Sequence, residues 1–261
     1  MTGGSEDRLP VDLSDLINNL YHTEDYFVRL PSLPHSRFEE EYHETTVDPD
    51  GSVRHLLADK ERDHKLKNFQ GEILSELMSH QKGKSILDIG CGPGWLLSAL
   101  DDSWLKCGVE ISKFASTYAA KYGTIYNGTL ETYRTTQKFD VIVAHHVFEH
   151  LEDPVFAIKK IHQLLKHGGT CILGTPNFDS AAARRYNNKF RLLHDNTHIS
   201  LFTSDSMHRF LRDHGFKIDK VEFPFFETDY FTESNLLKMM DEDTVSPPFY
   251  GSVMTFFATK I

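Results

Sequence analysis

Cysteine is scarce in this sequence, with 3 among 261 residues. Cys91, Cys107 and Cys171 form an odd set without paired spacing, which argues against a disulfide framework and favours a reducing compartment. Long apolar runs are also lacking, since none approaches the roughly 20 residues that a membrane helix needs. The polar, acidic first ten residues do not resemble a secretory signal. We therefore expect a cytoplasmic protein that is not inserted in a membrane.

Basic residues are in the minority, because 28 Lys and Arg face 38 Asp and Glu and give a formal charge of −10. Affinity for nucleic acid depends heavily on cations that neutralise phosphates, so this balance disfavours DNA or RNA as a partner. The best basic stretch, residues 184–191, is short. We expect a small-molecule substrate, and the sequence leaves a homodimer open.

Short β-branched, apolar runs alternate with helical stretches between residues 84 and 174. This alternation predicts βαβ units, an α/β fold and a parallel sheet. We expect residues 1–80 to form a helical extension or lid, and 81–261 to form the core, with inserts at about 177–200 and 225–250 over the site. The five predicted strands are Ser85–Ile89, Lys106–Glu110, Thr124–Tyr126, Phe139–Ala144 and Thr170–Gly174.

Helices are predicted from one-sided apolar spacing and from capping residues. One should end at Lys166, where basic residues and two glycines follow. Two more strands, Phe216–Phe223 and Ser252–Lys260, are expected near the end of the sequence. The predicted helices are Leu13–Tyr21, Arg54–Met78, Gly94–Leu100, Lys113–Tyr122, Val155–Lys166 and Ser204–His214.

Three glycines lie where the first strand of the predicted sheet turns into a helix. Gly90, Gly92 and Gly94 lack a Cβ, so backbone N–H groups there can approach a ligand closely. A dehydrogenase fingerprint would place a glycine where Trp95 stands. The loop therefore favours a ligand other than a dinucleotide.

Two acidic residues accompany the glycine loop. Asp88, at the end of the first strand, suits an ammonium group and would repel a pyrophosphate. Glu110 ends the second strand, 20 residues after Gly90, where a carboxylate can accept hydrogen bonds from both hydroxyls of a ribose. A nucleoside with a positively charged tail satisfies both requirements, and S-adenosylmethionine has that shape.

A family resemblance extends these observations over residues 84–221. The sequence resembles class I S-adenosylmethionine-dependent methyltransferases, and most of all the branch of ubiquinone-biosynthesis O-methyltransferases and of enzymes that methylate sugars and natural products. This resemblance implies a Rossmann-like, seven-stranded sheet of order 3-2-1-4-5-7-6 with an antiparallel seventh strand. The segments that carry it are SILDIGCGPGWLLSAL, CGVEISKFASTYAAKYG, YNGTLET, KFDVIVAHHVFEHLEDP, LLKHGGTCILGTPN and THISLFTSDSMHRFLRDHGFKI.

The resemblance also implies roles for individual residues. Glu110 would bind the ribose hydroxyls, Ile111 would pack on the adenine, and Thr129 and Leu130 would lie beside its edge. Arg62, which precedes the first strand, is our candidate for the methionine carboxylate. The methionine part would be held by Asp88, Gly90, Cys91, Gly92, Gly94 and Trp95.

Histidines follow the fourth strand, at the sheet edge where ligands bind in such folds. A hydroxyl acceptor must lose a proton during methyl transfer, and histidine has a suitable pKa for accepting it. We favour His146 as the base, expect His145 to line the cofactor pocket, and keep His198 as a further catalytic candidate. His150 is interpreted as structural.

Three alternatives remain open at this point. His146, Glu149 and His150 have a spacing that suits a metal, but they depart from the ligand set of metal-dependent RNA methyltransferases, so we expect no metal. A non-catalytic binding protein with the same fold is the second alternative, and N- or C-methylation is the third. Aromatic segments that suit either a lid or ordinary packing are Tyr21–Phe27, Tyr186–Phe190 and Phe223–Tyr230.

Overall fold

The computed structural model describes residues 12–31, 46–47, 53–54, 57–79, 85–224, 228–241, 243–248 and 251–261. Seven strands form one sheet in the order β6-β5-β4-β7-β8-β11-β10. No helix among the described residues is long and apolar enough to cross a membrane. The strands are β4 (Ser85–Ile89), β5 (Leu105–Glu110), β6 (Thr124–Asn127), β7 (Phe139–His145), β8 (Leu165–Pro176), β10 (Phe216–Glu222) and β11 (Val253–Lys260).

This sheet confirms the predicted fold class. Counted along the chain within the sheet, the order is 3-2-1-4-5-7-6. β11 is antiparallel to both of its neighbours, β8 and β10, and the remaining pairs are parallel. Two small pairings were not expected, β1 (Val28–Arg29) with β9 (Ser200–Leu201) and β2 (Thr46–Val47) with β3 (Val53–Arg54).

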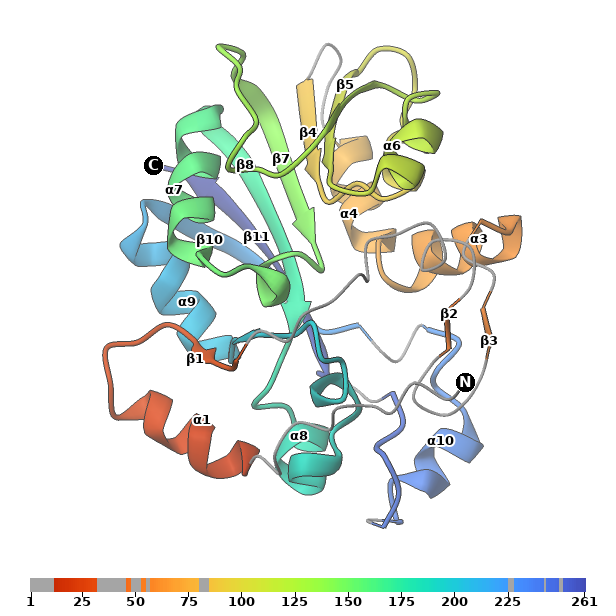
Figure 1. Cartoon of the computed structure of the whole chain (residues 1–261), viewed down its shortest axis with the longest axis vertical. Helices are drawn as coiled ribbons and strands as arrows, with labels where there is room; N and C mark the ends of the chain where they lie inside the picture. Colours follow the sequence, from red (N-terminus) through yellow and green to blue (C-terminus); the bar gives the residue numbers. More distant parts are fainter. Residues whose placement is uncertain are drawn as a thin grey trace.

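Helices cover both faces of the sheet (Figure 1). On one face, α7 (Pro154–Leu164) and α9 (Ser204–Asp213) contribute to a buried core with the strands. On the other face, α4 (Gly71–Ser79), α5 (Trp95–Ser98) and α6 (Lys113–Ala119) contribute to a second core. Burial of apolar surface on both faces is what fixes strands such as β4, whose five residues are all buried.

The helices predicted over Gly94–Leu100 and Lys113–Tyr122 are shorter in the structure, at Trp95–Ser98 and Lys113–Ala119, and two other predicted helices differ for a clear structural reason. The helix predicted over Arg54–Met78 is divided into α3 (Asp59–Asn68) and α4, with Phe69 and Gln70 between them. The helix predicted to continue to Lys166 ends at Leu164, because the extended, buried Leu165 pairs with Phe139 and begins β8. The basic and glycine residues that follow lie where the register between β7 and β8 shifts, and do not cap the helix.

The N-terminal helix α1 (Leu13–Tyr21) has the predicted bounds. With α8 (Ala181–Tyr186) it forms a third buried cluster, and both helices lie beyond the carboxyl ends of β7 and β8 (Figure 1). Leu13 N–H donates to Asn187 Oδ1 over 2.6 Å. The N-terminal segment is therefore part of the structure that surrounds the functional edge of the sheet.

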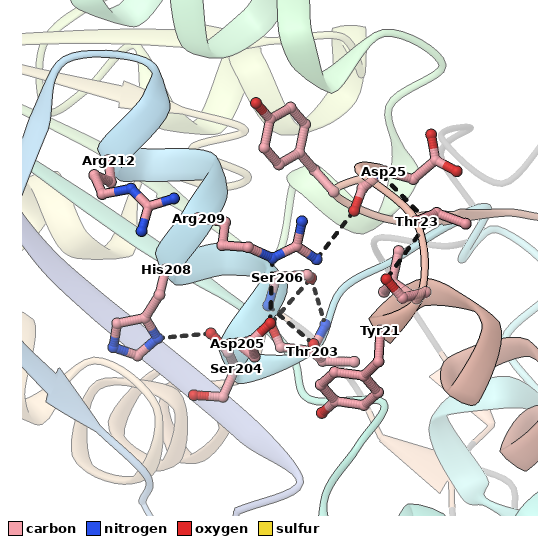
Figure 2. Close-up of polar contacts among 12 residues, drawn as sticks. Tyr21, Thr23, Asp25, Thr203, Ser204, Asp205, Ser206, His208, Arg209 and Arg212 are labelled. Carbon is pink, nitrogen blue, oxygen red and sulfur yellow. Dashed lines mark hydrogen bonds and ion pairs between the residues drawn. The ribbon is translucent and has the colours of Figure 1, made fainter.

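The stretch between α1 and β1 is held by α9, as Figure 2 shows. The Arg209 guanidinium donates to the backbone carbonyl of Asp25 over 3.1 Å and also bonds Asp205 over 3.2 Å. Thr203 and Ser206 form a reciprocal capping box that begins α9. A rigid helix start thus fixes the guanidinium that holds this stretch.

The remaining described elements lie at the same end of the sheet (Figure 1). They follow β7, β8 and β10 in the chain. They are the 3-10 turns η1 (Phe148–His150), η2 (Asn187–Lys189) and η3 (Arg191–Leu193), and the short helix α10 (Glu233–Lys238). Part of the predicted 225–250 insert lies outside the described residues.

Candidate active site

The glycine loop joins β4 to α5 and is shaped by left-handed backbone conformations. Gly90, Gly92 and Gly94 have φ values of +68°, +53° and +81°. A Cβ at Gly90 would lie 2.6 Å from Val147 Cγ2, and one at Gly94 would lie 2.9 Å from Ala119 Cα. At Gly92 no described atom lies within 4 Å of the same position. The loop is therefore closely packed at both ends and open at its centre.

Glu110 closes this loop from the end of β5. Its Oε2 accepts from Gly92 N–H and its Oε1 accepts from Ser112 N–H, each over 2.8 Å. Burial raises the pKa of the Glu110 carboxyl, while the two backbone donors and Lys65 act in the opposite direction. The carboxylate is thus already fixed beside the glycine loop.

Asp88 lies fully buried under the same loop. Burial raises the pKa of the Asp88 carboxyl to about 7, Lys65 opposes that shift and Glu110 adds to it. A carboxyl in this setting gains from a cationic partner, because the partner would offset the cost of burying its charge.

Lys65, on α3, is the basic side chain that influences both carboxylates. Its Nζ lies 5.8 Å from the centre of the Trp95 ring. The sequence pointed instead to Arg62, which pairs with Asp59 and Asp63 on its own helix, each over 3.0 Å. Lys65 is therefore the cation whose charge acts on the acidic pair, while Arg62 forms ion pairs with aspartates of its own helix.

The other predicted cofactor residues surround the loop and the end of β5. Cys91 is buried, and burial raises the pKa of its thiol well above the usual range, so it is not a nucleophile at neutral pH. Ile111 is exposed directly after β5. Leu130 packs in the core, and Thr129 N–H donates to Thr132 Oγ1 over 3.2 Å.

His146 has a left-handed backbone, with φ of +58°, which is rare for a residue with a side chain. Its Nδ1 lies 2.9 Å from Glu149 Oε1, and Thr175 Oγ1 donates to Glu149 Oε2 over 3.1 Å. Burial alone would raise the pKa of Glu149, but the hydrogen bond and charge of His146, together with His150 and His198, lower it to about 2. A fully buried carboxylate therefore orients the partly exposed imidazole of His146.

His145 lies beside His146, with their ring centres 4.5 Å apart. It is buried, and neither ring nitrogen has a hydrogen-bond partner among the described residues. Burial lowers the pKa of His145 well below its usual value, so the ring is neutral. Its Cδ2 would lie 2.1 Å from a Cβ at Gly174 on β8, so only glycine leaves room for this ring.

The rings of His150 and His198 lie 4.9 Å apart between centres and are tilted by 48°, and the charges of both lower the pKa of Glu149. Their Nδ1 atoms meet the backbone carbonyls of Thr197 and Leu192 at 3.1 and 2.5 Å. Burial lowers the pKa of His198 to about 4. One ligand-type atom each from Glu149, His150 and His198 lies within 4.8 Å of the others. His198 is thus brought to the site as a buried, neutral ring.

Aromatic rings lie next to His146. Phe69, at the end of α3, is 6.1 Å from the His146 ring, and Tyr230 is 5.8 Å from Phe69. His64 contacts both Phe69 and Tyr230, at 6.0 and 5.4 Å. We call Phe69, Tyr230 and His64 the aromatic roof. Its members come from the N-terminal extension and from the C-terminal insert.

The other predicted lid segments are ordinary packing. Tyr26 and Phe27 lie on Phe210 and Phe202, each 5.3 Å between ring centres. Tyr186 is buried in the α1–α8 cluster. The sequence did not identify Lys65 and Phe69 as site residues. One lysine in a mostly polar helix and one phenylalanine at its end do not show in the sequence which part of the molecule they contact.

Comparison with known proteins was made on sequence and on structure. Residues 59–221, more than half of the chain, match the family described as "Methyltransferase domain". The ubiquinone biosynthesis O-methyltransferase of Haemophilus ducreyi is 28% identical over 157 residues, which are 54% of this chain and 63% of that protein. The Psychrobacter arcticus enzyme of the same name is 33% identical over 108 residues, 36% of this chain and 42% of that protein. The chain thus spans less than two thirds of either relative.

Solved structures share the fold. The magnesium protoporphyrin IX methyltransferase of Synechocystis PCC 6803 with bound S-adenosylhomocysteine has a TM-score of 0.56 at 17% identity, over 78% of this chain and 89% of that one. An S-adenosylmethionine-dependent methyltransferase from Mesorhizobium loti has a TM-score of 0.54 at 20% identity, over 72% of this chain and 96% of that one.

Proposed function

Because this chain belongs to the methyltransferase domain family, we propose that it transfers the methyl group of S-adenosylmethionine to an oxygen of a small polar metabolite and releases S-adenosylhomocysteine. A sugar or a natural-product intermediate is the acceptor class that we favour. The observation that carries the proposal is the His146–Glu149 pair, which stands next to a glycine loop and an acidic pair suited to this cofactor.

The residues around the loop fit the cofactor. The surroundings of Gly90 and Gly94 leave no room for a side chain, whereas the open position at Gly92 lets a ligand approach the backbone. Asp88 suits the ammonium group, Lys65 suits the carboxylate of the methionine part, and Glu110 suits the ribose hydroxyls. Exposed Ile111 offers an apolar surface for adenine. When bound, the cofactor supplies an electrophilic methyl group on a sulfonium.

The remaining chemistry belongs to the chain. His146 accepts the proton of the acceptor hydroxyl at the imidazole nitrogen that does not face Glu149. The Glu149 carboxylate, through Nδ1, holds the ring in one orientation and stabilises the imidazolium that forms. A positioned general base of this kind contributes about 10²- to 10⁴-fold in rate. Val147, which packs on Gly90, ties the segment that carries the base to the cofactor loop.

A direct experiment combines binding with an acceptor screen. S-adenosylhomocysteine is titrated first, and the protein is then incubated with S-adenosylmethionine and a panel of sugars, phenols and amines, with mass spectrometry of the products. We expect a methylated oxygen in one of the hydroxyl compounds. His146→Ala should lower the rate by about 10²-fold or more with unchanged cofactor affinity. His167→Ala, which changes an exposed histidine, is the matched control.

Two outcomes would contradict this function. One is the absence of cofactor binding in the wild-type protein. The other is transfer to a hydroxyl acceptor at full rate in His146→Ala. That result would show that His146 is not the base, while the cofactor assignment would stand.

A further inference from the structure

Two segments far apart in the sequence are joined by one side chain. Asp229 Oδ1 accepts from Lys67 Nζ over 2.7 Å, and Asp229 Oδ2 accepts from Asn68 Nδ2 over 3.2 Å. The Asp229 N–H donates to Asn68 Oδ1 over 3.3 Å. Asp229 therefore uses both carboxylate oxygens and its backbone amide on two adjacent residues of α3.

These bonds lie immediately beside the aromatic roof. Phe69 follows Asn68 in the chain, and Tyr230 follows Asp229, so the polar contacts set the distance between the two rings. The Phe69 ring then reaches the ring of His146, at 6.1 Å. The hydrogen bonds of Asp229 thus fix what lies over the proposed base.

The Lys67–Asp229 ion pair by itself adds little to the stability of the fold. The Lys67 and Asp229 side chains are 62% and 53% exposed, and exposed ion pairs are weak. Asn68, in contrast, is buried, and its amide bonds Asp229, so these contacts fix the segment of Asp229 against the end of α3. α3 also carries Lys65, which acts on Asp88 and Glu110, so one short helix contacts both the cofactor side and the base side of the site.

We propose that Asp229 is a positioning residue, which holds Phe69 and Tyr230 over His146 and keeps water from the base. This inference rests on the proposed function, since it takes His146 as the group that needs protection. The contact between Asp229 of the insert and the end of α3 would thus give both segments a role in the reaction.

The experiment measures access to His146 and needs no acceptor. Each protein is treated briefly with diethylpyrocarbonate, and carbethoxylation of His146 is followed by peptide mass spectrometry, with exposed His167 as internal standard. Asp229→Ala should raise the rate at His146 about three- to tenfold, as expected for the loss of one weak ion pair and one side-chain hydrogen bond. The melting temperature should fall by only a few degrees, because the buried Asn68 amide loses one hydrogen bond, and labelling is carried out well below it.

Two further variants sharpen the result. Asp219→Ala removes another exposed aspartate that pairs with a lysine, Lys217, over 2.9 Å on β10, and should leave labelling of His146 unchanged. The exchanged pair Lys67→Asp with Asp229→Lys should restore protection in part, because the ion pair is re-formed with opposite polarity while the hydrogen bond from Asn68 is not.

Unchanged labelling in Asp229→Ala would overturn the proposal, as would an equal rise in Asp219→Ala or a rise that follows general unfolding. Titration of S-adenosylhomocysteine into the same samples separates this test from that of the function. If the wild-type protein does not bind S-adenosylhomocysteine, the proposed function is contradicted. The role of Asp229 is decided by the labelling rates alone.

Discussion

His146 Nδ1 lies 2.9 Å from Oε1 of Glu149, three residues ahead in the chain, and this contact joins a partly exposed imidazole to a fully buried carboxylate. The left-handed backbone at His146 turns the chain sharply enough for the two side chains to meet. Such a conformation costs on the order of 1 kcal/mol for a residue with a Cβ. The strain is confined to the residue that we propose as the base.

Glu149→Gln should make unfolding less sensitive to acid. The pKa of Glu149 is lowered from 4.5 to about 2, so the carboxylate adds stability that is present above pH 4.5 and lost as pH falls towards 2. In the wild-type protein the loss is on the order of 3 kcal/mol over the whole range down to pH 2, and about 1.4 kcal/mol of it falls between pH 5.5 and pH 3.5. Urea unfolding at these two pH values measures the latter part. An equal loss of unfolding free energy in both proteins would contradict the assignment.

Cofactor affinity should increase with pH through Asp88. Its pKa is raised to about 7, so the free protein holds a proton below that pH, which must leave before an ammonium group can pair with the carboxylate. We expect the affinity for S-adenosylhomocysteine to rise about tenfold per pH unit below 7 and to level off above it. Calorimetry from pH 6 to pH 8 provides the measurement.

Asp88→Asn is the control for that pH dependence. The amide does not titrate, so the affinity should be weak and flat over the same interval. The raised pKa also means that burial of Asp88 reduces the stability of the ligand-free protein as pH rises from 4 to 7. A wild-type affinity that is independent of pH would show that Asp88 does not face the ammonium group.

Glu110→Ala should weaken S-adenosylhomocysteine binding by about 100-fold or more, because hydrogen bonds to a charged group contribute roughly 1.5–3 kcal/mol each and the ribose offers two hydroxyls. The variant also frees Gly92 N–H, which Glu110 now holds at 2.8 Å. Glu131→Ala, at an exposed acid, is the matched control. Affinities that agree within twofold for all three proteins would rule out Glu110 as the ribose ligand.

Gly174→Ala should destabilise the protein, and His145→Ala should relieve that effect. The new Cβ would lie 2.1 Å from His145 Cδ2, and overpacking of this kind costs about 1–3 kcal/mol. In the double variant the ring is absent, so the cost should largely disappear. A double-mutant cycle of unfolding free energies tests this. Additive effects would mean that the ring moves aside without cost.

Dialysis against EDTA should change neither cofactor affinity nor stability. Glu149, His150 and His198 lie close enough together to hold an ion. However, both oxygens of Glu149 already have partners in His146 and Thr175, and a metal would have to displace them. Elemental analysis of the purified protein should therefore find no bound metal. A stoichiometric transition metal that is lost in Glu149→Gln would revive the metal-dependent alternative.

The sequence was informative wherever a local pattern determines the outcome. β4 is a mostly apolar run with Asp88 just before its last residue, β5 is apolar just before Glu110, and the glycines between them permit the left-handed turns of the loop. The seven-stranded order followed from motifs in a known sequence order. These features depend on contacts among neighbouring elements, and the hydrophobic periodicity and the turn residues of the sequence predict such contacts.

The rest depends on contacts across the chain that leave no local trace. Lys67 and Asp229 are 162 residues apart and look like ordinary surface charges. Arg62 and Lys65 lie on one polar helix, and only the tertiary structure shows which of them faces Asp88. The φ of +58° at His146 is equally hidden, because histidine adopts a left-handed backbone more often than most residues but still only rarely, so the residue type does not single out this position.

The anchoring of α1 has a consequence for synthesis of the protein. Leu13 finds its partner in Asn187, 174 residues later, and Val28 pairs with Leu201. During translation, the first helix therefore leaves the ribosome long before the surface that receives it exists. The apolar face of α1, with Leu13 and Ile17, therefore remains exposed to solvent or bound to a chaperone until β9 has emerged. α1 is thus synthesised well before its partners and can pack only after they have emerged.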